Sequence, residues 1–446
     1  MSLDGPALLS DLLDKAKKAG ADAADAMLVE SQSLSVTHRL GKLENVERSE
    51  SADLGLRLMI GKRQAIVSAS DLSKESLERL VENGISIAKS VPEDAYAGLA
   101  DPDQIITDIP DLDLDDGVEK DAEELAAMSA AAEDAAREMP KITNSEGANA
   151  GWSRNTETIC ATNGFVGVSK NSGHSLSVSV IASEGDGPME RDYDYATKVR
   201  AADLPDPAEI GRNAAERAAK RINPRKVKSQ AVPVVFDPRV SGSVIRHLIS
   251  AISGPSVAKG TTFLKGRLDE EVFAKEISIV EEPLRANGLR SRAFDDEGLA
   301  AASGKLIDHG VLKTWLLDCA SARQLGLDPT GHGARGLSSA PSPSPSNVYL
   351  EPGALAPKNL IATITDGFYV TEMLGMGVNG VTGDYSRGAA GFWIEQGELS
   401  YAVSEVTIAG SLPEMFKQIT AANDLEHRTG IDAPTLRIDG LTIAGE

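Results

Sequence analysis

The N-terminal part of the chain switches between helical and strand-like hydrophobic patterns. Close to the N-terminus, apolar residues recur at the spacing of one helical face. The residues of this face are Leu9, Leu12, Leu13 and Ala16. The next segments alternate apolar and polar residues on both sides of Gly41 and then of Gly61, as antiparallel hairpins do. A second helical pattern begins after Ser73, the expected N-cap, and stops at Pro92, so we predict a meander of strands followed by a helix.

A similar order of patterns returns about 130 residues further on, which is too long a period for a solenoid repeat. Residues 157–183 alternate like a hairpin, and residues 203–224 again form a helical pattern that ends at a proline. The copies are separated by an acidic, proline-containing connection at residues 92–116 and an Ala/Glu-rich helix expected at residues 118–138. We therefore predict that the N-terminal part arose by duplication.

The second half of the chain changes character around residues 225–230, where we place a domain boundary. Beyond it the pattern predicts a strand, a helix at 239–254, strand pairs within 298–327, an extended Ser/Pro stretch, further strands, a helix at 411–425 and a closing strand. The expected fold class is α+β, with antiparallel-rich sheets and packed helices. It comprises two domains, at residues 1–226 with two strand-meander/helix repeats and at residues 227–446 with mostly antiparallel strands.

Composition limits the classes of function. The formal net charge of −22 repels phosphate backbones, so we expect no nucleic-acid partner, and we interpret the basic cluster at 221–228 as a helix end and linker. No secretory signal and no long apolar run is present, which predicts a cytoplasmic protein without a membrane partner. Cys160 and Cys319 follow apolar residues in strand-like runs and fit core packing better than a disulfide framework. His309 and Cys319 are expected on one hairpin at opposite faces, which argues against a nucleophile and base pair.

Two glycine-rich segments offer candidate sites. Gly375, Gly377 and Gly380 have the spacing of a dinucleotide fingerprint, but no helix follows to hold a pyrophosphate at its N-terminus. We interpret these glycines as positions of positive φ or of close approach by another chain. His332 lies in a second glycine-rich loop, where a functional side chain could be exposed.

The helix predicted at residues 239–254 carries a single histidine, His247. A zinc peptidase places two histidines on one helix face, with a glutamate that activates the bound water and a third ligand elsewhere. The residues that follow His247 are apolar or neutral, beginning with Leu248. Because one imidazole cannot hold zinc alone, the residues by themselves indicate a core helix with one histidine.

Several long blocks of the sequence resemble the TldD/PmbA peptidase family, specifically its PmbA (TldE) branch. The resemblance extends over nearly the whole chain and is most specific in its last two blocks. The blocks are SLSVTHRLGKLENVERSESADLGLRLMIGKRQAIVSASDLSKESLERL, HSLSVSV, VVFDPRVSGSVIRHLISAISG, GARGLSSAPSPSPSNVYLEPG and GVNGVTGDYSRGAAGFWIEQGELSYAVSEVTIAGSLPEMFKQI.

In the TldD branch of this family the helix carries an HExxxH zinc motif, and a cysteine near the C-terminus is the third ligand. Matched to this chain, the motif falls on His247, Leu248 and Ile252. No cysteine follows Cys319, and the corresponding C-terminal segment offers His427 but no thiol. The resemblance therefore implies a vestigial catalytic position at His247, no metal or cofactor in this chain, and zinc in a TldD-like partner.

The resemblance further implies a non-catalytic subunit of a cytoplasmic heterodimer whose subunits enclose a cleft. Such a complex cuts flexible or unfolded peptides, including leader peptides of ribosomally made modified peptides and labile antitoxins. We expect the peptide to bind as an added strand along residues 377–391. The candidate substrate-binding residues are Gly380, Asp384, Tyr385, Arg387 and His332.

Two alternatives to this interpretation stay open. The chain could be an independently active hydrolase that uses His332, Asp384 and Arg387 around a shared cleft. In the other alternative, Asp384 and Arg387 form only a local ion pair on a solvated hairpin.

The oligomeric state is predicted from one apolar segment and from the resemblance. Phe392, Trp393 and Ile394 supply more large side chains than one face of a sheet needs. We therefore expect a homodimer when the chain is alone and a heterodimer with a TldD-like partner.

Overall fold

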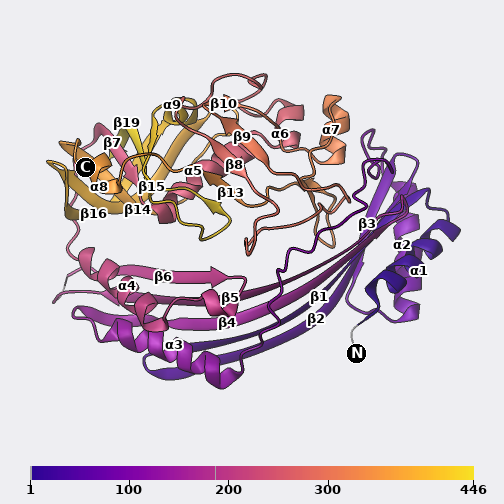
Figure 1. Cartoon of the computed structure of the whole chain (residues 1–446), viewed down its shortest axis with the longest axis horizontal. Coiled ribbons are helices and arrows are strands. Elements are labelled where there is room, and N and C mark those ends of the chain that lie inside the picture. The colour runs from indigo at the N-terminus through magenta and orange to yellow at the C-terminus, as the bar shows by residue number, and fades with distance from the viewer. Residues whose placement is uncertain (1–2, 186, 446) are drawn as a thin grey trace.

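The computed structural model describes residues 3–185 and 187–445. Figure 1 shows a long, bent sheet formed by the N-terminal half, with the C-terminal half on its concave side. The fold is α+β with antiparallel-rich sheets and packed helices, as predicted.

The N-terminal half repeats one order of elements twice. The first copy comprises α1 (Gly5–Lys18), β1 (Ala23–Arg39), β2 (Lys42–Ile60), β3 (Arg63–Ala69) and α2 (Lys74–Ser90). The second comprises α3 (Ala122–Arg137), β4 (Ile142–Ala161), β5 (Val166–Ala182), β6 (Glu190–Lys198), the 3-10 turn η1 (Ala201–Asp203) and α4 (Pro207–Lys220). One six-stranded sheet joins them in the order β3-β2-β1-β4-β5-β6, so the first strands of the copies pair in its centre. The predicted duplication is confirmed.

Local capping and apolar faces explain the helices of this half. The predicted apolar face of α1 is buried and shares a core with α2 and with strands β1–β3. The helices α3 and α4 share a second core with β4 and β5. Helix α3 begins at Ala122, later than predicted. Asp121 and Glu124 form a capping box, which fixes the N-terminal end of the helix at this point.

The C-terminal half is built from many short elements around one closed sheet. The helices are α5 (Pro238–Ala251), α6 (Gly254–Lys259), α7 (Cys319–Leu325), α8 (Pro357–Ile361) and α9 (Leu412–Lys417). The strands are β7 (Gln230–Phe236), β8 (Ile279–Glu281), β9 (Gly304–Asp308), β10 (Val311–Leu312), β11 (Gly333–Ala334), β12 (Ser342–Pro343), β13 (Val348–Leu350), β14 (Asp366–Leu374), β15 (Asp384–Glu395), β16 (Glu398–Ser411), β17 (Ile419–Ala421), β18 (Ile431–Asp432) and β19 (Leu436–Ala444).

The main sheet of this half has the order β16-β15-β14-β7-β19-β17, and β16 also pairs with β19, so the sheet closes on itself. A second sheet runs β10-β9-β8-β13-β18, and β11 pairs with β12. The division at residues 226/227 stays a prediction. Within the described residues, no helix is both long and apolar enough to cross a bilayer.

Two sequence predictions in this half were wrong. Residues 298–327 form one hairpin, β9–β10, and then α7, because Asp318 caps a helix that begins at Cys319. Cys319 is therefore not on a hairpin with His309, which occupies the β9–β10 turn at φ 45°. The helix expected at 411–425 ends at Lys417, since the following residues pair with β19 as strand β17.

The apolar segment at residues 392–394 contributes to two hydrophobic cores of the chain itself. Trp393 is buried in the large core of this half, and Ile394 is buried on the other face with α8. The excess of large side chains therefore has an explanation within one subunit and does not by itself require an oligomer.

Candidate functional site

Helix α5 is positioned by the strand before it and by its own cap. Strand β7 ends at Phe236, and the Asp237 side chain then accepts a hydrogen bond from the Arg239 backbone N–H at 2.9 Å. The apolar face of α5 packs into the largest core of the molecule through Val244, Ile245 and Leu248. The polar residues of α5 are left for the opposite face.

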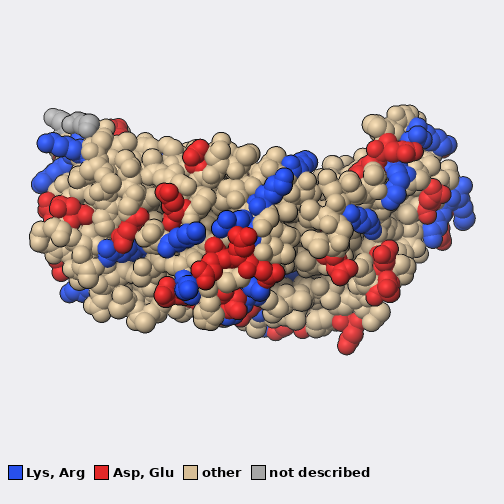
Figure 2. All heavy atoms as spheres, turned by 90° about the horizontal axis from the view of Figure 1, so that it is seen from above, with Lys and Arg blue, Asp and Glu red and all other residues tan. Residues whose placement is uncertain are grey.

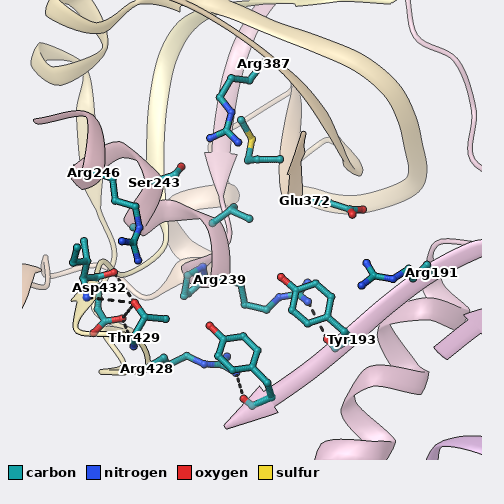
Figure 3. A pocket seen from close by; sticks show the side chains of 16 residues that line it. Arg191, Tyr193, Arg239, Ser243, Arg246, Glu372, Arg387, Arg428, Thr429 and Asp432 are labelled. Carbon is teal, nitrogen blue, oxygen red and sulfur yellow. Dashed lines mark hydrogen bonds between the residues drawn. The ribbon is translucent and has the colours of Figure 1, made fainter. Parts of the chain in front are cut away.

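Two cavities lie along this polar face. The first, of about 520 Å³, lies beside the N-terminal part of α5, between β6, the β14–β15 region and residues 428–432. The second, of about 210 Å³, lies beside the C-terminal part of α5 and the loop between β14 and β15. Figure 3 shows the side chains that face the first cavity. Its lining residues are Arg191, Tyr193, Tyr195, Pro238, Arg239, Val240, Gly242, Ser243, Arg246, Glu372, Met373, Arg387, Arg428, Thr429, Ile431 and Asp432.

His247 lines the second cavity and contacts Tyr385. The two rings meet edge to face with centroids 5.7 Å apart. Burial, and secondarily the charge of Arg387, lowers the pKa of His247 to about 4, so the imidazole is neutral at neutral pH. Its Nε2 atom is buried without a hydrogen-bond partner among the described residues.

The residues around His247 do not fit a zinc ion. Leu248 and Ile252 are both 0% exposed and belong to the large core, so neither side chain faces the cavity. His427 contacts Tyr349 and lines a different cavity. The described part of the chain holds no group of three or more His, Cys, Asp or Glu side chains arranged to bind a metal.

The predicted substrate-binding residues Gly380, Tyr385 and Arg387 lie around α5. Gly380 lines the second cavity, and a Cβ there would meet nothing closer than 3.8 Å. Tyr385 is buried, burial raises the pKa of its hydroxyl, and this hydroxyl has no partner within the described residues. Arg387 lines the first cavity and donates one hydrogen bond, from Nε to the Gly375 carbonyl at 2.9 Å.

Asp384 is exposed and forms no ion pair with Arg387 in the described structure. Its carboxylate accepts a hydrogen bond from the Thr382 hydroxyl at 2.6 Å. The alternative of a local Asp384–Arg387 pair therefore does not describe this hairpin.

The glycine-rich edge of β15 is already occupied by the preceding loop. The Ser386 backbone N–H donates to the Gly377 carbonyl at 2.7 Å, and the Asn379 N–H donates to the Asp384 carbonyl at 2.9 Å. A peptide could add here as a strand only by displacing residues 377–379, so the cavities beside α5 are better placed to receive it.

His332 is buried away from these cavities, contrary to the exposed loop position that the glycines suggested. It is 7% exposed, and its Nε2 atom lies 2.8 Å from the Glu281 carboxylate while Nδ1 contacts the Thr330 hydroxyl at 2.8 Å. It lines neither cavity beside α5. The structure therefore does not bring His332 together with Asp384 and Arg387.

Sequence reasoning missed most of the first cavity. Its other arginines are Arg191, Arg239, Arg246 and Arg428. Two signals were available: residues 191, 193 and 195 alternate on β6, and residues 239 and 246 lie two helical turns apart on α5. Neither signal shows that these segments face each other.

Comparison with known proteins identifies the class to which this fold and cleft belong. Models of the PmbA/TldA metallopeptidase family match its domain 1 at residues 24–88, its central domain at 115–222 and its C-terminal domain at 229–445. The metalloprotease PmbA of Escherichia coli O157:H7 is 37% identical over 427 residues, covering 95% of this chain and 93% of that protein.

Solved structures share the fold over the whole chain. A candidate modulator of DNA gyrase from Bacteroides thetaiotaomicron superposes with a TM-score of 0.91 at 29% identity, covering 100% of both chains. TldE from Thermococcus kodakarensis shares the fold with a TM-score of 0.87 at 21% identity, covering 98% of this chain and 100% of that one. The chain belongs to the PmbA/TldD metallopeptidase family.

Proposed function

We propose that this chain is the non-catalytic, TldE/PmbA-like subunit of a cytoplasmic TldD-type zinc metallopeptidase complex that degrades or processes flexible peptides. The observation that carries the proposal is the polar face of α5, which offers one histidine with an unpartnered Nε2 and no second metal ligand. Both positions matched to the rest of the zinc motif lie in the core. A complex of this kind needs zinc and the activated water from a TldD-like partner.

In this complex the cleft of the present chain would bind and orient peptide. Arg387 faces the first cavity, while Gly380 and His247 face the second, so a peptide along α5 would pass all three. Backbone carbonyls and carboxylates are the peptide groups that a guanidinium recognises best. Leader peptides and labile antitoxins are substrates of suitable flexibility.

The test compares the chain alone with the chain mixed with a TldD-like partner. We expect the purified chain to hold no stoichiometric zinc and to cleave no flexible peptide, whereas the mixture holds zinc and cleaves. Elemental analysis and peptide mass spectrometry measure both. Cleavage by the chain alone, or about one zinc per chain lost on His247→Ala, would overturn the proposal in favour of an independent hydrolase.

The assembly itself is tested by sedimentation. We expect a homodimer of the chain alone and a heterodimer in the mixture. A chain that stays monomeric at micromolar concentration and in the presence of the partner contradicts this part of the proposal.

A further inference from the structure

The first cavity is rich in arginine although the chain as a whole is strongly acidic. Five arginines and two acidic residues line it, in a protein of net charge −22. On the face of the molecule shown in Figure 2, by contrast, basic side chains are interspersed with acidic ones. The lining therefore concentrates one sign of charge in a concave site, which attracts anions.

Three of the five arginines have acidic partners. Arg191 binds Glu146 at 2.6 Å, Arg239 binds Asp192 at 2.8 Å, and Arg428 binds Asp194 at 3.0 Å. The first pair joins β6 to β4 within the N-terminal half, and the other two hold β6 against the C-terminal half, so these three charges already serve the fold.

The two acidic residues of the lining also have partners outside the set of cavity arginines. Glu372 binds Arg221 at 2.7 Å, and Asp432 accepts hydrogen bonds from the backbone N–H groups of Thr429 and Gly430. Neither is paired with an arginine of the cavity.

Arg246 and Arg387 remain without an acidic partner. Within the described residues, the guanidinium of Arg246 forms no salt bridge, and Arg387 uses only Nε, for the Gly375 carbonyl. Both terminal nitrogens of the Arg387 guanidinium therefore remain available for hydrogen bonds, and their planar arrangement suits the two oxygens of a carboxylate. Figure 3 shows both arginines among the side chains that surround the cavity.

Unpartnered polar atoms beside these arginines point independently to a ligand. Ser243 Oγ, His247 Nε2 and Tyr385 OH are buried without hydrogen-bond partners among the described residues. Ser243 and His247 lie one turn apart on α5 and line the first and second cavity, and the buried Tyr385 ring packs edge to face against His247. A buried polar group left unpaired destabilises the fold, and a hydrogen bond from a bound polar ligand would remove that penalty.

The second cavity adds an apolar subsite. It includes Phe263, Met376, Val378 and Leu412, next to His247. The Met376 side chain is 84% exposed, so apolar surface is available there to a bound group.

We propose that the cleft along α5 binds a peptide through a carboxylate held between Arg246 and Arg387, with a neighbouring apolar side chain in the second cavity. The substrate class is then a flexible peptide that carries an acidic residue, or its own C-terminus, beside an apolar residue. The proposal refines the proposed function, on which it rests for the role of the bound peptide. The binding itself is measurable on the chain alone.

The test measures binding of a fluorescent Gly/Ser decapeptide that ends in Leu-Glu with a free C-terminus. Matched peptides carry a C-terminal amide, a Glu→Gln change or both. We expect the doubly neutral peptide to bind at least about 10-fold more weakly than the di-acid, a difference of about 1.4 kcal/mol. If only the amidated peptide binds more weakly, the arginines bind the C-terminal carboxylate. If only the peptide with the Glu→Gln change binds more weakly, they bind the glutamate side chain.

Variants of the protein complete the test. Arg246→Gln and Arg387→Gln should each weaken binding of the di-acid about 10-fold and leave the doubly neutral peptide unchanged, while Arg387→Lys, which keeps the charge but loses the fork, has an intermediate effect. Arg267→Gln, at an exposed arginine paired with Glu270 outside the cavity, is the matched control and should bind as the unchanged chain does. Thermal melting of each variant reports its folding.

Two results would overturn the carboxylate site: equal binding of acidic and neutral peptides, including no binding of either, or unchanged affinity in a folded Arg246→Gln/Arg387→Gln double variant. Failure of the proposed function appears elsewhere, as zinc or cleavage activity in the chain alone. A complex that cleaves acidic and amidated peptides equally well would reject the carboxylate site and retain the function.

Discussion

Two of the contacts between the halves of the molecule differ in how their charged residues are arranged. At the cleft contact, defined by Asp192, Asp194, Arg239 and Arg428, the four charges form ion pairs, and two further arginines, Arg246 and Arg387, face an open cavity. At the distal junction, β1, β2 and β4 meet residues 292–297 and 335–337, and carboxylates accumulate: Glu297 is buried, whereas Glu157 and Asp296 line a separate cavity.

The distal junction contains one strong ion-pair cluster and several carboxylates with raised pKa values. Asp25 pairs with Arg57 at 2.6 Å and also with Arg335. Burial, reinforced by neighbouring carboxylates, raises the pKa of Glu297 and of Glu157 to about 7 and that of Asp296 to about 6. Arg292 lowers the pKa of Glu157 and Asp296, and Arg57 that of Glu297, but burial outweighs these effects.

The difference between the two contacts shows that the surroundings of an unpaired charged group determine whether it stays charged. Arginine stays charged in a cavity that water reaches, so an unpaired guanidinium there is available to a ligand. A buried carboxyl without enough partners instead takes up a proton, because the charged form is poorly solvated. The cleft contact is thus suited to binding, and the distal junction to pH-dependent stability.

The largest effect is expected from breaking the ion pairs of the distal junction. Asp25→Ala leaves Arg57 and Arg335 buried without their shared carboxylate and should lower the free energy of unfolding by about 3–5 kcal/mol. Urea denaturation measures the change. Asp308→Ala removes the acid of an exposed pair with Lys305 and should cost less than about 1 kcal/mol. Equal losses in the two variants would contradict the distinction between buried and exposed charge.

The equivalent change at the cleft contact should cost slightly less. Arg239→Met removes the 2.8 Å partner of Asp192, a side chain that is 3% exposed, but Arg221 remains 3.5 Å from the same carboxylate. We expect a loss of about 3 kcal/mol, at the low end for a broken buried pair. Denaturation beside Arg267→Met, an exposed control, tests this. A loss below about 1 kcal/mol would show that the cleft pairs contribute little to holding the halves together.

The pH dependence of stability distinguishes the two contacts further. The folded chain holds the proton of Glu297 more tightly than the unfolded chain does, so the stabilisation that Glu297 contributes is fully present below pH about 4.5 and is lost as pH rises through about 7. At about 1.4 kcal/mol per pKa unit, Glu297 accounts for about 2–3 kcal/mol of stability lost in this way. Glu297→Gln should remove that share, because the amide oxygen can still accept the hydrogen bond from the Cys319 N–H.

Denaturation at pH 5 and pH 8 measures this effect, with Glu276→Gln at an exposed position as the control. If Glu297→Gln lost as much stability between these pH values as the unchanged chain, the carboxyl would not be protonated in the fold at pH 5.

The smallest effects are expected where glycine permits close approach of the halves. A Cβ on Gly55 would lie 2.3 Å from the Leu337 carbonyl oxygen at the distal junction, and one on Gly242 would lie 2.6 Å from the Ile431 carbonyl oxygen beside the cleft. Each Gly→Ala change should cost about 1–2 kcal/mol through overpacking. Gly173→Ala, where the nearest atom is 3.4 Å away, should change thermal stability by less than about 0.5 kcal/mol. If Gly55→Ala left the stability unchanged, the backbone at the distal junction would be able to shift and accommodate the added Cβ.

Local patterns in the sequence were sufficient for the repeated elements of the N-terminal half. The buried face of α1, the hairpins around Gly41 and Gly61 and the duplicated order follow from hydrophobic period and turn residues, which act over a few neighbouring positions. The single histidine of α5, without a second ligand at the matched positions, was also readable, since ligand type and helical spacing are local properties.

Only the tertiary structure decided which residues share the cleft and which charges are free within it. The cavity is lined by β6, α5, β15 and residues 428–432, which are up to 241 residues apart along the chain, from Arg191 to Asp432. Arg239 differs from Arg246 because only Arg239 pairs with a distant acid, Asp192. The burial of His332 against Glu281, the occupied edge of β15 and the strand β17 also depend on partners far away in sequence. Hydrophobic periodicity carries no information about such partners, because they are chosen by the packing of whole elements.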